Sequence, residues 1–175
     1  RCLGNLLIVT SLILLSQLLV NPASAAEPLE DWRVETRAGL EKAVQFLLDH
    51  QEEDGAFGHW RNPLSPDDKN WMVPEQHFAF QVAITGICCV TLMDLGSDLP
   101  DGGEQALERA LDNICENGRR KRIANWDTDN LWGYVYVLEA VARALAEPEL
   151  RFGPERRARL RKLGEDLIVT LGNYQ

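Results

Sequence analysis

The stretch LEKAVQFLL (residues 40–48) recurs further along the chain as LERALDNIC (residues 107–115), and this repetition decides the fold. In both copies apolar residues stand at positions i, i+4, i+7 and i+8, which places them on one face of a helix. The charged residues of both copies fall on the opposite face. Because repetition at this scale is typical of arrays of similar helical units, the sequence predicts stacked helices with one buried side each.

A third helix of the same kind is predicted near the C-terminal end, over residues 155–172. Its apolar stripe consists of Leu160, Leu163, Leu167 and Leu171. Pro154 precedes the stripe, and proline is tolerated in the first turn of a helix because its missing N–H has no partner there.

Two further segments, residues 78–95 and 131–146, have apolar residues on nearly every face. A helix of that kind must be surrounded by protein or by lipid. Gln81, Thr85 and Glu139 lie within these segments, and such polar residues favour a buried helix of a protein core over a membrane-spanning one. The predicted order is therefore outer, inner, outer, inner, outer: residues 35–50, 78–95, 104–116, 131–146 and 155–172.

This alternation predicts an all-α protein built as a double-layered α/α helical-hairpin array, without β-strands. The spacing does not distinguish a closed toroid from an open superhelix, because both stack helix pairs against their neighbours.

The N-terminal residues have the layout of a signal peptide. An apolar run over residues 6–20 is followed by Ala23-Ser24-Ala25, which fits an A-x-A cleavage site. The run is shorter than the roughly 20 residues that a membrane-spanning helix needs, although an uncleaved anchor is the alternative. We therefore expect residues 1–25 to be a signal peptide and residues 26–175 to form one secreted or periplasmic domain. Membrane contact is expected only through the signal segment before cleavage.

The composition of the 175 residues is that of a globular protein, with 45% hydrophobic residues. The 18 basic and 27 acidic side chains give a net charge of −9. An acidic chain repels phosphates, so a nucleic-acid partner is not expected. Beyond Cys2 the chain contains Cys88, Cys89 and Cys115, an odd number that argues against a disulfide scaffold and for buried thiols.

The end of the first predicted helix carries the motif QEEDGAFG (residues 51–58). Asp54 and Gly55 form a turn pair, Gly58 allows a second reversal of the chain, and Phe57 offers a ring to pack beneath the turn. Gln51 can bind the free carbonyls of a helix end.

This motif resembles the Q-x-x-D-G-x-W/F motif of the prenyltransferase and squalene oxidase repeat, which occurs in the terpenoid cyclase and protein prenyltransferase superfamily. The resemblance implies an α/α toroid in which the motif staples an outer helix to its neighbours. Because toroids of this superfamily contain more helix pairs, residues 26–175 are expected to be the N-terminal part of a toroid that is truncated at its C-terminus.

The segment Asp127-Thr128-Asp129-Asn130 is similar to the D-x-D-D acid motif of cyclases of the squalene-hopene type. The resemblance implies Asp129, with Asp127 as its partner, as the catalytic acid. Asn130, however, stands where the motif has its fourth carboxylate. The catalytic carboxyl group would need such partners to stay protonated and to become a stronger acid. The alternative is that Asp127 or Asp129 caps the helix that follows, where a carboxylate accepts backbone amides and opposes the helix dipole.

Aromatic residues near the predicted inner helices are candidates for a ligand site. Aromatic side chains with a few polar groups are typical of cavities that orient apolar ligands, and loop packing is the alternative. The candidates are Trp60, Trp71, His77, Trp132 and Tyr134. The chain lacks the D-x-C pair of protein prenyltransferase zinc sites, so neither a metal ion nor another cofactor is expected.

The sequence leaves several functions open. Export and the missing fourth carboxylate favour a module that binds a protein partner or an apolar, isoprenoid-like ligand. The first alternative is a terpenoid cyclase-like enzyme, of the isomerase or lyase class, that cyclises an isoprenoid by acid initiation. A carbohydrate-active toroid enzyme is the second alternative.

Overall fold

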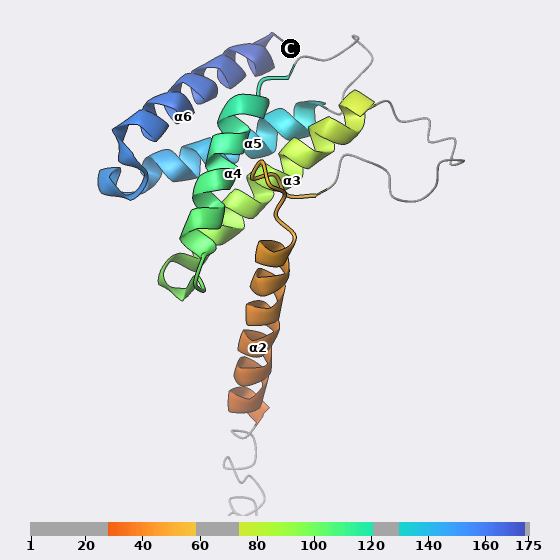
Figure 1. Ribbon diagram of the computed structural model, residues 1–175, viewed down its shortest axis with the longest axis vertical. Helices are drawn as coiled ribbons and strands as arrows, with labels where there is room; N and C mark the ends of the chain where they lie inside the picture. The colour runs from red at the N-terminus through yellow and green to blue at the C-terminus, as the bar shows by residue number, and fades with distance from the viewer. Residues whose placement is uncertain (1–27, 59–73, 121–129, 174–175) are drawn as a thin grey trace, which may run out of the picture. The chain divides into compact units, whose positions relative to one another are not determined.

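The computed structural model describes residues 28–58, 74–120 and 130–173, with side chains from residue 32 in the first stretch and from residue 78 in the second. The chain divides into two compact units, residues 1–42 and residues 43–175. The described elements are all helical (Figure 1). In chain order they are α2 (Pro28–Asp49), α3 (Pro74–Leu95), the short 3-10 helix η2 (Gly96–Asp98), α4 (Gly103–Asn117), α5 (Asn130–Ala146) and α6 (Glu149–Gly172).

The predicted all-α class is confirmed. The described residues contain no β-strand, and Gln51 and Phe57 form an isolated bridge. Three of the helices differ from the predicted bounds by four residues or fewer at either end, whereas α2 and α6 begin six or seven residues earlier than predicted. In α6 the backbone leaves helical geometry at Gly153, where φ is 70° and ψ is 159°. Pro154 then opens the longer segment, in the first-turn position that the sequence predicts.

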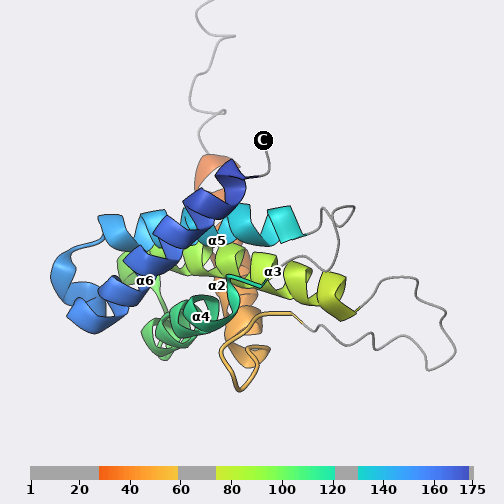
Figure 2. The same ribbon diagram turned by 90° about the horizontal axis from the view of Figure 1, so that it is seen from above.

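Helices α3 and α5 lie side by side and run in the same direction (Figures 1 and 2). Their order of contacts shows the direction, since Gly86 meets Tyr136 and, further along both helices, Asp94 pairs with Arg143. The helices approach closely at Gly86, where an added Cβ would stand 2.8 Å from the carbonyl oxygen of Tyr136. A side chain at this position would force the two helices apart.

Helices α4 and α6 also run in the same direction, and charged side chains join them. Arg156 binds both carboxylate oxygens of Asp112 at 3.0 Å, and this hydrogen bonding holds the pKa of Asp112 below its ordinary value. The ion pairs follow the two helices in order: Glu104 with Arg151, Asp112 with Arg156, and Arg119, just beyond the end of α4, with Asp166.

The core of residues 43–175 consists of the apolar stripes of α4 and α6 and one side each of α3 and α5. Cys88, Cys89 and Cys115 are free and buried, as predicted, and burial raises the pKa of the Cys88 and Cys115 thiols to about 11. The fully buried large side chains include Leu92, Leu107, Leu111, Ile114, Val137, Val141, Leu160, Leu163 and Leu167.

The stretch Phe78–Asp98 is long and apolar enough to cross a membrane, by length and composition only. In the described structure it packs against α4 and α5. Its polar residues Gln81 and Thr85 are buried and hydrogen-bonded to backbone atoms of residues 57, 58 and 81, so their polarity is satisfied inside the protein.

Two expectations about burial are wrong. The inner helices were predicted to be apolar and covered on nearly every face, but α3 and α5 each leave one apolar side exposed. On α2 the predicted stripe is buried only in part: Val44 is buried, Leu47 and Leu48 are half-buried, and Leu40 is exposed. Periodicity identifies apolar faces, whereas their burial depends on whether another element covers them.

Candidate functional site

The motif of residues 51–58 joins the end of α2 to α4 through the side chain of Gln51. Its amide nitrogen donates to the carbonyl oxygen of Gly55 at 3.0 Å and to that of Ala106 at 2.8 Å. The guanidinium of Arg109 donates to the amide oxygen of Gln51. Since Ala106 and Arg109 belong to α4, one side chain connects the turn to a helix more than 50 residues away.

The turn itself is fixed by Asp54 and Gly55. A carboxylate oxygen of Asp54 accepts the N–H of Ala56 at 3.0 Å, and Asn113 of α4 donates to the Asp54 carbonyl at 3.1 Å. Gly55 has a φ of 86°, and an added Cβ would stand 2.4 Å from the carbonyl oxygen of Arg109. Glycine is therefore required at this position both by the backbone conformation and by the closeness of α4.

The second half of the motif binds α3. Phe57 is buried, and its N–H donates to the hydroxyl of Thr85 at 2.9 Å. The amide of Gln81 donates to the carbonyl of Gly58 at 2.8 Å. The motif thus ties α3 and α4 together around the end of α2 and forms a staple, a name we use below for residues 51–58.

Replacing Gln51 by alanine should lower the free energy of unfolding by about 2 kcal/mol, because the three hydrogen bonds of its side chain are lost. Gln45→Ala is the matched control, since its exposed side chain donates a hydrogen bond to Asp49 one turn further along α2. We expect that change to cost about 0.5 kcal/mol or less. Urea unfolding followed by circular dichroism measures both values, and equal losses would show that the staple contributes nothing specific.

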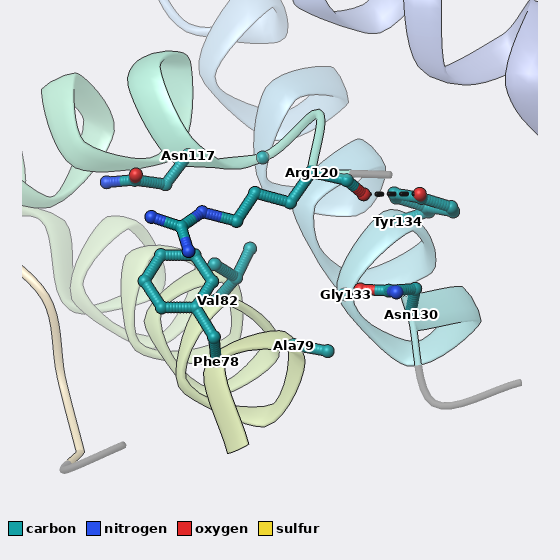
Figure 3. Close-up of a pocket in the computed structure, with 9 residues that line it drawn as sticks. Phe78, Ala79, Val82, Asn117, Arg120, Asn130, Gly133 and Tyr134 are labelled. Atoms are coloured by element: carbon teal, nitrogen blue, oxygen red, sulfur yellow. Dashed lines mark hydrogen bonds between the residues drawn. The ribbon is translucent and has the colours of Figure 1, made fainter. Parts of the chain in front are cut away.

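A small pocket lies where α3 and α5 begin, beside the end of α4 (Figure 3). The guanidinium carbon of Arg120 lies 3.3 Å from the centre of the Phe78 ring, and the hydroxyl of Tyr134 donates to the Arg120 carbonyl. The remaining space is about 10 Å³, which suffices for about one water molecule. This pocket is too small to hold an isoprenoid or a sugar.

Most of the predicted catalytic and ligand-binding residues lie outside the described residues. Asp127, Asp129, Trp60 and Trp71 are among them, and so is the side chain of His77, whose backbone belongs to α3. Helix α5 begins at Asn130, directly after Asp129, so the capping of this helix by Asp127 or Asp129 stays a prediction.

The structure does not bring Trp132 and Tyr134 together on one surface. Both belong to α5, but Trp132 is 53% exposed whereas Tyr134 is only 3% exposed. Residues two positions apart on a helix point about 200° apart, so the two side chains lie on different sides of α5.

The inner helices present an apolar surface that the sequence reasoning missed. We name it the α3/α5 apolar face. Its side chains are between 37% and 53% exposed, and they are Phe80, Ile84 and Ile87 of α3 with Trp132 and Val135 of α5. The i, i+4, i+7 spacing on α3 was a signal for it, but the abundance of apolar residues on the other faces hid that signal.

The two exposed stripes lie on one side of the helix pair. The residues roughly opposite to them, such as Leu92 on α3 and Val141 on α5, are buried in the core that α4 and α6 complete. Asp94 and Arg143, which border the two stripes, form an ion pair across the helices. The α3/α5 apolar face is therefore directed away from α4 and α6.

Comparison of the chain with protein-family models, with curated proteins and with solved structures finds no match. Within the described ranges, no group of three or more His, Cys, Asp or Glu side chains could hold a metal ion. The features of the described structure that bear on function are the staple, the helix arrangement and the α3/α5 apolar face.

Proposed function

We propose that the chain is an exported binding module and that it forms the N-terminal part of an α/α toroid of the prenyltransferase and squalene oxidase repeat type. Its ligand or protein partner contacts the α3/α5 apolar face. Export is supported by the apolar run of residues 6–20 and the cleavage pattern Ala23-Ser24-Ala25.

The arrangement of the helices supports the toroid proposal. α3 and α5 run in one direction, α4 and α6 form a second parallel pair, and short connections join α3 to α4 and α5 to α6. This is the order that a double-layered helical-hairpin array requires. The staple supports the family resemblance, since it connects the end of an outer helix to the next outer helix and to an inner one.

The α3/α5 apolar face is the observation that carries the binding function. A fully exposed large apolar side chain presents roughly 200 Å² to solvent. The exposed fractions of the five residues then correspond to about 400 Å² of apolar surface in contact with water. Patches of about 300 to 600 Å² on soluble proteins are often binding sites. In a toroid this side of the inner helices is the concave side, on which ligands are enclosed.

The difference from the D-x-D-D motif at Asn130 supports a binding module over a cyclase. A carboxylic acid that protonates an alkene needs neighbouring groups that keep it protonated and make it a stronger acid. Asn130 provides an amide where the cyclase motif has a carboxylate, and it is buried at the start of α5. Asp129 is therefore proposed as a helix cap, and no isoprenoid cyclisation is expected.

The dye anilinonaphthalene sulfonate, whose fluorescence rises in apolar sites, tests whether the α3/α5 apolar face binds ligands. We expect the full chain to bind the dye and Ile87→Glu to weaken binding by about 5-fold or more, because a charge on the face repels an apolar anion. Ile168→Glu, which alters an exposed isoleucine on α6, is the matched control and should change binding by less than about 2-fold.

Equal dye binding by Ile87→Glu and Ile168→Glu would contradict the proposed contact surface. The enzyme alternative has its own readout, which is product formation from an isoprenoid such as squalene. If the unaltered protein cyclises squalene and a folded Asp129→Asn variant does not, the cyclase replaces the binding module, because asparagine can cap a helix but cannot donate an acidic proton.

A further inference from the structure

We infer that the α3/α5 apolar face binds an amphipathic helix of a partner protein, with apolar side chains at i, i+4 and i+7 and basic residues beyond one end of that stripe. This inference rests on the proposed function and specifies the partner. It is drawn from the size, the shape and the charge of the face.

The size of the face fits a single helix better than a second copy of this chain. A stable protein dimer usually buries about 800 Å² on each partner. The five exposed side chains offer about half of that area. From Phe80 to Ile87 the face is about 10 Å long, which corresponds to two turns of a helix. A partner helix would cover this length with three anchor residues.

The shape of the face also fits a helix. α3 and α5 are parallel and approach closely at Gly86, and the exposed side chains of both helices lie along one side of the pair. Phe80, Ile84 and Ile87 make one row, and Trp132 and Val135 make the other. An amphipathic helix that lies along such a face presents apolar residues one turn apart to it, a common mode of peptide recognition.

The charge at one end of the face indicates basic residues on the partner. Toward the C-terminal ends of α3 and α5 the face is bordered by Asp94, Arg143 and Glu139. Arg143 pairs with Asp94, so the three groups carry one net negative charge. The last turn of α3 contains no basic residue. A lysine or arginine of the partner would be attracted to this negatively charged end of the face.

The test uses a fluorescein-labelled synthetic peptide of about 18 residues, long enough to form a helix. The peptide carries leucines at i, i+4 and i+7 followed by two lysines, and a second peptide has glutamates in place of the lysines. Fluorescence anisotropy measures the Kd for the full chain. We expect the lysine peptide to bind at least about 5-fold more tightly than the glutamate peptide at low salt, with a smaller difference at high salt.

Variants of the chain locate the peptide. Ile87→Glu should weaken binding of the lysine peptide by about 10-fold, and Glu139→Lys should weaken it by about 3-fold at low salt. The exposed residues of α6 supply matched controls, Ile168→Glu and Glu165→Lys, and both should stay within about 2-fold of the unaltered chain. Circular dichroism verifies that each variant remains folded. Glu139→Lys is a change at an exposed position and keeps the test valid if Ile87→Glu unfolds.

Three results would overturn the inference. The first is equal binding of the lysine and glutamate peptides, and the second is equal loss in the face variants and the α6 controls. The third is a dimer in sedimentation experiments that Ile87→Glu dissociates, which would make a second copy the occupant. If the dye binds the α3/α5 apolar face but neither peptide does, the inference fails and the proposed function stands. If the dye does not bind there, the proposed function fails as well.

Discussion

Val141→Asp should lower the free energy of unfolding by about 3 to 5 kcal/mol, because it places an unpaired carboxylate in the protein core. Val141 is 2% exposed, and α6 passes so near that a Cβ added at Gly164 would stand 3.1 Å from a methyl group of Val141. Urea unfolding followed by circular dichroism measures the loss. A change of this size is a large part of the total stability of a domain, so partial unfolding at room temperature is expected.

The control for this substitution is on the same helix. Val135→Asp replaces a valine of α5 that is 49% exposed on the α3/α5 apolar face, where water can solvate the carboxylate. We expect it to cost about 0.5 kcal/mol or less. Similar unfolding midpoints for Val141→Asp and Val135→Asp would show that α5 does not have one buried and one exposed side.

The second large effect is expected for Gly55→Ala, which should cost about 3 kcal/mol. An alanine at a φ of 86° is strained by about 1 to 2 kcal/mol. The added Cβ would also stand 2.4 Å from the Arg109 carbonyl oxygen, so the turn and α4 must separate, at a further cost of about 1 to 3 kcal/mol. Because the staple connects distant helices, the loss should appear in the unfolding of the whole core.

Gly102→Ala separates the two contributions to this cost. Gly102 has nearly the same φ, 84°, but an added Cβ there has no atom within 4 Å. This control should therefore show only the conformational strain, about 1 to 2 kcal/mol. If Gly55→Ala were no more destabilising than Gly102→Ala, the close contact between the staple and α4 would not exist in solution.

Sequence spacing was sufficient to predict the helices. The stripe of Leu107, Leu111 and Ile114 is buried as expected, and Pro154 opens the long segment of α6. These features depend on neighbours three or four positions apart, so local periodicity reports them directly. The additional turn of α6 before Gly153 was missed, because the positive φ of that glycine lets the chain resume a helix after a break that looks like a boundary.

The candidate site was predictable only where its chemistry is local. The turn at Asp54 and Gly55 follows from residue types, because a carboxylate can bind an N–H two positions on and glycine tolerates a positive φ. The partners of Gln51 do not follow in this way. Ala106 and Arg109 are 55 and 58 residues away, and only the packing of α4 beside the turn brings them into hydrogen-bonding distance.

The sequence by itself determined the all-α class, the order of the helices and the turn of the staple. Only the tertiary structure decided which apolar side chains are covered. Ile87 and Leu92 are both apolar residues of α3, yet Leu92 is buried in the core and Ile87 is exposed. The physical reason is that the hydrophobic effect depends on the area removed from water, and that area is set by the neighbouring elements rather than by the residue itself.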